Sequence, residues 1–221
     1  MKKDFFVKWT PGMAYVLGYF CADGSMFINP RGSKYISFYS VDQELLTKVK
    51  HIMNSPNRIG EKTTANKNWK KLYSLQIGSK KIYSDMLKLG LTPTKAKRMT
   101  LPNIPNEFLH HFIRGYFDGD GCITYGTYKK KDRSTNSFCV MVRFASSSKD
   151  FLQNVLKQLS LAAKLSGGSI SRNGDSYHLV YSKNDSGKLF DFMYNNVSRN
   201  YYLERKYNKF KSAFEISGAV A

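Results

Sequence analysis

The sequence predicts an α+β fold that consists of two similar halves. Three observations support this fold: helical and strand-like segments alternate, GYFCADG at residues 18–24 returns as GYFDGDG at 115–121, and each copy is followed by segments in the same order. Each half should contain a helix, a strand pair, a second helix, a second strand pair and a third helix. We place the halves at 1–100 and 101–221, with a linker at about 92–107 that is rich in proline and polar residues.

The first half begins with apolar residues that favour a helix. Residues 13–22 predict this helix, and Asp23-Gly24 should end it. Aromatic and β-branched residues predict four strands, at 25–29, 34–40, 57–63 and 70–78. Apolar residues at spacings of three and four predict amphipathic helices at 42–53 and 79–90.

The second half repeats this order. Residues 109–121 predict a helix that again ends in an acid. Strands are expected at 122–126, 137–146, 168–174 and 176–182. Amphipathic helices are expected at 148–165 and 186–196. The order of segments therefore indicates an internal duplication of roughly one hundred residues, which suits two fused subdomains.

The chain carries a strong positive charge. Its 35 Lys and Arg residues exceed its 16 Asp and Glu residues by 19, and both halves contribute to the surplus. Such a surplus predicts an anionic partner. Because the sequence has no apolar run of membrane-spanning length and no continuous basic amphipathic helix, we expect a nucleic acid rather than a membrane.

The cysteines indicate the compartment. Cys21, Cys122 and Cys139 are odd in number and lack CxxC spacing, which argues against a disulfide framework and against a zinc site. The residues after Met1 show no apolar stretch of a secretory signal. We therefore expect an intracellular, reducing compartment, either a bacterial or archaeal cytoplasm or the matrix of an organelle.

The two predicted motif helices carry small residues four positions apart. These residues are Gly18 and Ala22 in the first helix and Gly115 and Gly119 in the second. Small residues at this spacing lie on one helix face and allow two backbones to approach closely. If the two faces meet, Asp23 and Asp120 become neighbours, and two such carboxylates at helix C-termini call for a hard divalent cation such as Mg²⁺.

A single helix that ends in Asp-Gly is ordinarily only a helix stop. The second copy of both the small-residue spacing and the acid favours a functional reading. Ser40 and Ser146 end equivalent predicted strands, where they could either position solvent or cap a turn.

The segments LGYFCADG at 17–24 and IRGYFDGDG at 113–121 resemble the two signature motifs of the LAGLIDADG homing endonucleases. The resemblance is to the monomeric form of that family, and it covers nearly the whole chain. It implies two pseudo-symmetric αββαββα halves, each with a curved antiparallel sheet, and motif helices that pack at the central interface. The two sheets would together form a saddle that binds DNA along its major groove.

The resemblance also implies where the metal ions bind. The last acid of each motif maps onto Asp23 and Asp120, which would hold the catalytic ions together with the preceding residues Ala22 and Gly119. The ion would be Mg²⁺ or another divalent cation, such as Mn²⁺ or Ca²⁺. The earlier acid of the pattern is kept as Asp118, but Cys21 replaces it in the first motif.

A lysine late in each half is a further family feature. The second half offers Lys206, and the first offers Lys95 or Lys97, between which the sequence does not choose. These lysines would organise solvent and balance charge near the acids.

Residues on the outward side of the strands should contact DNA. Arg143 takes the place in the second half that Ser37 has in the first, and such polar residues would read bases while lysines hold phosphates. The predicted DNA contacts are Phe27, Asn29, Arg31, Lys34, Tyr35, Ser37, Tyr39, Lys62, Lys67, Lys70, Ser74, Gln76, Thr124, Tyr128, Lys129, Lys130, Arg133, Arg143, Arg172 and His178.

The function that the resemblance implies is a site-specific DNA endonuclease. It would hydrolyse both strands of a long asymmetric target with a staggered cut, act as a monomer and be encoded in an intron. The alternative is a protein on the same scaffold that has lost cleavage, either an intron maturase that binds its own intron RNA or a regulator that binds DNA. The presence of both Asp23 and Asp120 favours the enzyme.

Overall fold

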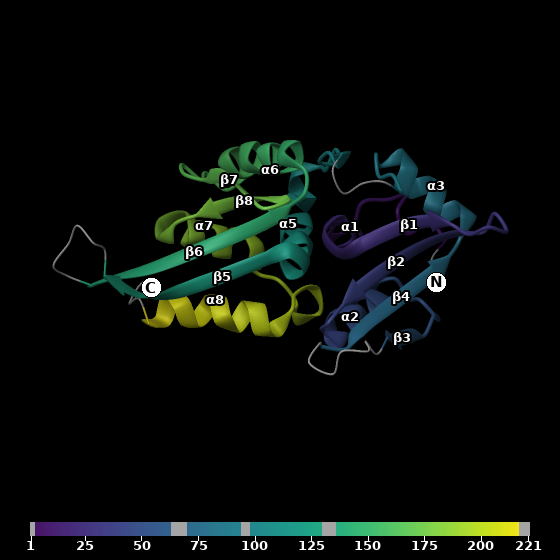
Figure 1. Cartoon of the computed structure of the whole chain (residues 1–221), viewed down its shortest axis with the longest axis horizontal. Coiled ribbons are helices and arrows are strands. Elements are labelled where there is room, and N and C mark those ends of the chain that lie inside the picture. The colour runs from purple at the N-terminus through teal and green to yellow at the C-terminus, as the bar shows by residue number, and fades with distance from the viewer. Residues whose placement is uncertain (1–2, 63–69, 94–97, 130–135, 217–221) are drawn as a thin grey trace.

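The computed structural model describes residues 3–62, 70–93, 98–129 and 136–216. These residues form an α+β fold of two pseudo-symmetric halves that lie side by side (Figure 1). Each half has one four-stranded antiparallel sheet, in the order β1-β2-β4-β3 in the first half and β5-β6-β8-β7 in the second. The predicted fold class is thus confirmed.

The first half follows the predicted order of elements. These are α1 (Pro11–Asp23), β1 (Gly24–Ile28), β2 (Lys34–Ser40), α2 (Gln43–Ile52), β3 (Ile59–Lys62), β4 (Leu72–Gly78) and α3 (Lys80–Lys88). The start of α1 is fixed by Thr10, whose hydroxyl accepts a hydrogen bond from the Met13 amide at 3.0 Å, and by Pro11 in the first turn.

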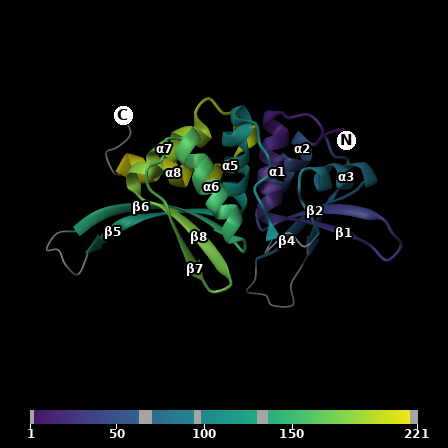
Figure 2. The same ribbon diagram turned by 90° about the horizontal axis from the view of Figure 1, so that it is seen from above.

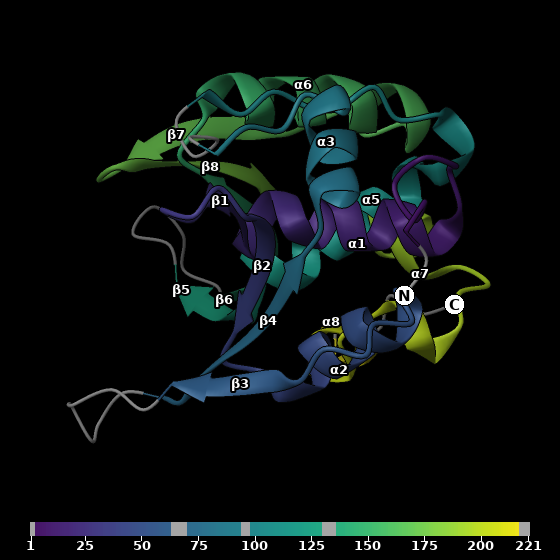
Figure 3. The same ribbon diagram turned by 90° about the vertical axis from the view of Figure 1, so that its right-hand side faces the viewer.

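The second half has the same order, followed by a short 3₁₀ helix and one more α-helix. Its elements are α5 (Asn106–Asp120), β5 (Gly121–Lys129), β6 (Asn136–Ser146), α6 (Lys149–Ala162), β7 (Ser169–Asn173), β8 (Ser176–Tyr181), α7 (Lys183–Tyr194), the short 3₁₀ helix η1 (Arg199–Tyr201) and α8 (Glu204–Ile216). Helix α8 was not predicted. It runs beneath the second sheet and reaches toward α2 in the first half (Figures 1 and 3).

Several boundaries differ from the sequence prediction by a few residues, those of β5 and α5 among them. Strand β5 was expected at 122–126 but extends to Lys129, because Tyr128 and Lys129 continue the ladder by pairing with Ser137 and Asn136. Helix α5 begins at Asn106, three residues before the predicted start at 109.

The motif helices α1 and α5 stand side by side at the centre of the molecule (Figure 2). The sheets spread away from this pair on one side, and the remaining helices cover the other side (Figures 2 and 3). The sheet faces toward the helices carry core residues such as Ile36, Phe38, Val142, Phe144 and Leu179, which are all at most 1% exposed. The opposite faces of the two sheets point away from the helices.

Candidate active site

Glycines bring the two motif helices into backbone contact. A Cβ atom built on Gly18 would lie 2.0 Å from the Phe112 carbonyl oxygen, and one on Gly115 would lie 2.0 Å from the Tyr15 carbonyl oxygen. A side chain of any size would therefore collide with the backbone of the opposite helix. The prediction that the two small-residue faces meet is confirmed.

The acids end these two helices. Helix α1 ends at Asp23 and α5 ends at Asp120, and each is followed by a glycine in extended conformation. The side chain of Asp23 reaches the last turn of α5, since a Cβ atom on Gly119 would lie 3.2 Å from its Oδ2 atom and 2.4 Å from the Cβ of Ala22. The two acidic helix ends are therefore adjacent.

One pocket lies beside each acid. The Asp23 pocket encloses about 220 Å³ and is lined by Asp23, Tyr39, Ser40, Val41, Asp42, Leu72, Asp118, Gly119 and Arg205. The Asp120 pocket encloses about 190 Å³ and is lined by Cys21, Ala22, Gly24, Met99, Tyr116, Asp120, Ser146 and Ser147. Each pocket thus contains the acid that ends one motif helix, residues from the last turn of the other motif helix, and the end of one inner strand.

The same backbone framework supports both pockets. Tyr19 donates a hydrogen bond to the carbonyl of Tyr39, and Tyr116 donates one to the carbonyl of Ala145. Burial raises the pKa of both phenols well above its ordinary value, so they remain protonated donors. These bonds fix the strand ends relative to the motif helices.

The serines at these strand ends act as turn acceptors. Ser40 Oγ accepts a hydrogen bond from the Asp42 amide at 2.9 Å, and Ser146 Oγ accepts one from the Ser148 amide at 3.1 Å. Of the two roles left open by the sequence, the structure shows turn capping.

The family assignment follows from the sequence match. A model described as LAGLIDADG-like domain matches residues 11–89 and 107–192, which together cover most of the chain and contain both motif helices. This chain belongs to the LAGLIDADG family. Among curated proteins, none matches the chain.

Solved LAGLIDADG structures share the fold. The meganuclease I-AabMI bound to uncleaved DNA has a TM-score of 0.64 and 16% identity, with 95% of this chain and 91% of that chain covered. The homing endonuclease I-LtrWI bound to target DNA has a TM-score of 0.63 and 12% identity, with 94% and 91% covered. I-SmaMI bound to uncleaveable DNA has a TM-score of 0.62 and 16% identity, with 94% and 90% covered.

No helix in the described parts of this LAGLIDADG chain has the length and apolar character that a membrane crossing requires.

The donor atoms suit a hard cation. In the described residues, no three His, Cys, Asp or Glu side chains cluster as a metal site. What the centre of this LAGLIDADG fold offers is two carboxylates at adjacent helix ends, together with the carbonyl oxygens of the last helical turns. Such an all-oxygen set fits Mg²⁺ or Ca²⁺, which complete their coordination with water and phosphate oxygens.

Lys206 lies at the end of α5 in an unexpected role. Its ammonium donates hydrogen bonds to the carbonyl oxygens of Phe117, Asp118, Gly119 and Gly121, at 2.6, 2.8, 2.9 and 2.7 Å. Burial lowers its pKa to about 8. Lys206 was predicted to organise solvent and balance charge near the acids; the structure shows its ammonium as a cap on the helix C-terminus, where Asp118, Asp23 and Asp120 each act to raise its pKa.

Asp118 lies buried behind the same helix end. Its Oδ2 atom accepts hydrogen bonds from the Tyr15 hydroxyl at 2.7 Å and from the Leu203 amide at 2.8 Å. Burial raises the pKa of this carboxyl to about 6. Asp118 thus ties the segment before α8 to both motif helices.

An ion pair in the Asp23 pocket escaped the sequence reasoning. Arg205 Nε donates to Asp42 Oδ1 at 3.0 Å, and a second guanidinium nitrogen donates to Oδ2. The Arg205 hydrogen bond is the main reason that the pKa of Asp42 is lowered. In the sequence, Asp42 stands at the N-cap position of α2, and its neighbours in the chain do not indicate that its partner lies 163 residues away.

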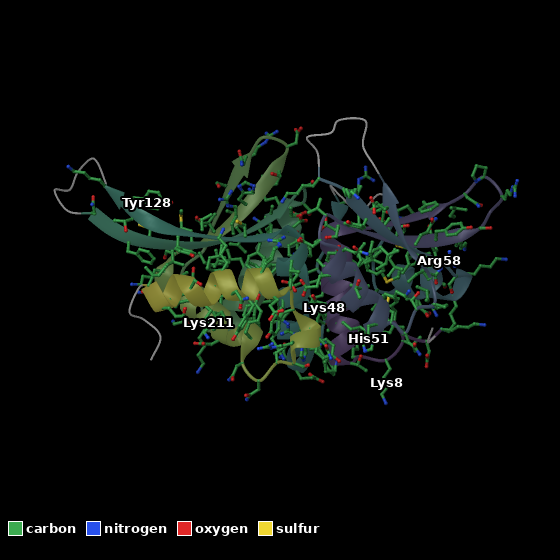
Figure 4. The ribbon with its side chains drawn as sticks, turned by 90° about the horizontal axis from the view of Figure 1, so that it is seen from below. Lys8, Lys48, His51, Arg58, Tyr128 and Lys211 are labelled. Carbon is green, nitrogen blue, oxygen red and sulfur yellow. The ribbon has the colours of Figure 1, made fainter. Side chains whose placement is uncertain are left out.

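The strand registers define an outward face on each sheet, opposite the core residues. In the first sheet it carries Ser25, Phe27, Tyr35, Ser37, Tyr39, Ser74 and Gln76. In the second it carries Cys122, Thr124, Gly126, Tyr128, Ser137, Cys139, Met141, Arg143, Ala145, His178 and Val180. Tyr128 lies near the far end of β5 on this side, whereas Lys8, His51 and Lys211 lie on the helix side (Figure 4).

Three predicted DNA contacts do not share the outward face. Lys34 pairs with Ile28 on the helix side of the first sheet, where its ammonium lies 5.3 Å from the centre of the Tyr83 ring. Lys129 and Arg172 have the helix-side alternation of Ile123 and Ile170. These three residues were predicted as DNA contacts because they are basic. Side chains alternate between the two faces of a sheet, and the register places these three on the helix side.

Other predicted contacts lie in turns or outside the described residues. Asn29 and Arg31 belong to the turn between β1 and β2, where Asn29 Oδ1 accepts a hydrogen bond from the Ser33 amide at 2.8 Å. Lys70 is exposed just before β4. The candidates outside the described residues are Lys67, Lys95, Lys97, Lys130 and Arg133, and the side chain of Lys62 is likewise not described.

Proposed function

We propose that this chain is a site-specific endonuclease that hydrolyses both strands of a DNA duplex. One observation carries the proposal: Asp23 and Asp120 come together at the centre of the molecule, between two sheets whose outward faces lie on one side. The net charge of +19 supports a polyanionic partner. Similar folds bind DNA in I-AabMI and I-LtrWI, which supports duplex DNA as that partner.

In this proposal, the residues that hold divalent ions are Asp23 and Asp120, together with the backbone oxygens of Ala22 and Gly119. The Gly119 oxygen also accepts a hydrogen bond from the Lys206 ammonium at 2.9 Å, so an ion there would use its second lone pair. A bound Mg²⁺ would stabilise negative charge on the reacting phosphate and acidify a water molecule. The chain's own contribution is to fix the two acids at one place, because Gly18 packs against the Phe112 backbone and Gly115 against the Tyr15 backbone, which holds the helices together.

The two pockets would each serve one strand of the duplex. Each contains one of the two helix-end acids and the end of one central strand, so the two reactions would occur at neighbouring phosphates on opposite strands. Because the halves are not identical, the target would be long and asymmetric, and the cut staggered. The chain would act as a monomer encoded in an intron, and Lys95 or Lys97 would supply the basic group of the first half.

The proposal is tested by removing the acids singly. We expect Asp23→Asn and Asp120→Asn to lower cleavage in Mg²⁺ by about 100-fold or more while specific DNA binding remains, because a neutral amide no longer holds the ion. A randomised duplex library selected for binding and for cut products provides the substrate. Asp191→Asn, at an exposed position of α7, is the matched control and should cut normally.

Two results would contradict the enzyme. Unchanged cleavage by both acid variants would remove the acids from the reaction. Specific binding without strand scission in Mg²⁺ or Mn²⁺ by the unaltered chain would favour the alternative, a DNA-binding regulator, and specific binding of its own intron RNA instead would favour a maturase.

A further inference from the structure

Arg143 has an unusual environment on the outward face of the second sheet. It lies in β6, which is an inner strand, and its neighbours across the sheet are Cys122 on β5 and Val180 on β8. These neighbours offer no carboxylate. Arg143 therefore stands between a weakly polar and an apolar residue in the middle of the face that we assign to DNA.

Arg143 differs from the other arginines that the structure describes. Arg114 is buried but hydrogen-bonded to the carbonyls of Met193 and Tyr201, and Arg205 is paired with Asp42. Among the arginines in the described residues, Arg143 is the only one that is partly buried and has no hydrogen-bond or ion-pair partner. Partial burial without an acceptor is unfavourable, so this site favours a ligand that supplies acceptors.

The position of Arg143 selects between two such ligands. A phosphate and the major-groove edge of guanine both present two acceptors that fit the planar guanidinium. Phosphates line the rims of the groove, whereas base edges form its floor. An inner strand in the middle of a sheet faces the floor, so guanine is the better match.

The equivalent place in the first half has a different chemistry. Ser37 aligns with Arg143, since Ser37 pairs with Ser25 as Arg143 pairs with Cys122. Ser37 is only 2% exposed, and the accessible polar group beside it is Gln76 on the inner strand β4. A glutamine amide makes two hydrogen bonds to adenine in the major groove.

We propose that Arg143 reads a guanine in one half of the target and that Gln76, on the strand next to the position equivalent to Arg143, reads an adenine in the other half. This inference rests on the proposed DNA function and adds the identity of two bases. It makes the target depart from a palindrome at these two places, because Ser37 takes the place of Arg143 in the first half and Val180 takes the place of Gln76 in the second.

The test combines protein variants with single-atom changes in the DNA. Libraries selected with the unaltered chain, Arg143→Ala and Gln76→Ala identify the base preference that each variant loses. The identified guanine is then replaced by 7-deazaguanine, and the identified adenine by 7-deazaadenine, which remove only the N7 acceptor. We expect each replacement to weaken binding by the unaltered chain about tenfold and to leave the matching alanine variant unaffected.

Arg143→Lys separates base reading from phosphate binding. If Arg143 held a phosphate, lysine would keep the charge and most of the binding to every sequence, and no base preference would change in either variant. Lysine can also donate to guanine O6 and N7 but lacks the planar fork, so we expect Arg143→Lys to weaken the guanine preference less than Arg143→Ala does. Melting temperatures equal to that of the unaltered chain show that the variants fold.

Each contrary outcome is distinct. Uniformly weaker binding to all sequences by Arg143→Ala makes the residue a phosphate contact and overturns the inference alone. Equal sensitivity of Arg143→Ala and the unaltered chain to 7-deazaguanine also overturns it. Recovery of no preferred sequence by the unaltered chain overturns both this inference and the proposed function.

Discussion

The two motif helices, α1 and α5, are alike at the glycines where they touch and differ in the residues beside that contact. On the shared face, Gly18 and Gly115 make equivalent contacts, each with a Cβ distance of 2.0 Å to a carbonyl of the other helix. Beside this contact, α5 carries Arg114 and Asp118, whereas the aligned positions of α1 hold Leu17 and Cys21. A mutual contact constrains both helices equally, but nothing requires the same support behind each.

The support behind α5 comes from the end of the chain. Arg114 donates hydrogen bonds to the carbonyls of Met193 and Tyr201, Asp118 accepts one from the Leu203 amide, and Lys206 caps the helix. A pair of similar motifs can thus be held by an apolar core on one side and a buried polar network on the other.

The largest expected effect tests the shared face. Gly18→Ala and Gly115→Ala should each lower the free energy of unfolding by more than about 3 kcal/mol, because the new methyl group meets backbone that cannot move aside. Urea unfolding measures this loss. The two variants should agree within about 1 kcal/mol if the contact is as symmetric as the distances indicate.

Gly187→Ala in α7 is the control for these glycine variants. A Cβ atom there would lie 3.6 Å from Phe214 Cε1, which is an ordinary contact, so alanine should stabilise this helix by about 0.5–1 kcal/mol. A loss of similar size in all three variants would show that helix packing is not the cause.

The next effect tests the difference between the helix ends. Lys206→Met should lower the free energy of unfolding by about 2–3 kcal/mol, because four carbonyl oxygens at the end of α5 lose their donor. Lys209→Met, at an exposed position of the same helix, should change it by less than about 0.5 kcal/mol. Equal effects of the two variants would argue against the cap.

The pH dependence of stability sharpens the same difference. Burial raises the pKa of Asp118 from 3.8 to about 6, so the unfolded chain binds fewer protons than the folded chain between these values. The stability of the unaltered chain relative to Asp118→Asn should therefore fall as pH rises from about 4 to 6, by at most about 1.4 kcal/mol per pH unit. Urea unfolding across this range measures it, and a constant difference would contradict a buried titrating carboxyl.

The smallest effect concerns the ion pair in the Asp23 pocket. Arg205→Gln should cost at most about 1 kcal/mol near pH 7, because the arginine side chain is 56% exposed and solvent screens the pair. Arg205 lowers the pKa of Asp42, so this contribution should disappear as pH falls below the ordinary value of 3.8. Arg199→Gln, whose pair with Glu204 is longer at 3.7 Å, should cost less. A loss that persisted at low pH would point to packing of Arg205 rather than to its charge.

The sequence was sufficient for the fold and for the shared face. Periodicity located the helices and strands, and the repeated glycines predicted the α1–α5 contact because both effects depend on local residue spacing. It was not sufficient for α8, where the glycines and acid that mark the motif helices are absent and no aligned segment of the first half pointed to a helix.

The roles of Lys206 and Asp42 depend on distant segments. Lys206 was expected near the acids, and the structure does place it at the end of α5, but its partners are carbonyls of a helix more than 80 residues away in sequence. For both Lys206 and Asp42, the residue type alone predicts only that the charge is balanced by some partner. Only the three-dimensional arrangement shows whether a cation neutralises a carboxylate, a helix dipole or solvent.

The hydrogen bonds that join Asp42 to Arg205 and Lys48 to the carbonyl of Tyr202 close loops of 163 and 154 residues. Such contacts form late, since the chain must give up a large loop entropy before it gains them. During synthesis, the first half emerges from the ribosome long before residues 193–206 are available to support α5. The completed centre is therefore expected as the last event of folding, after both sheets have formed.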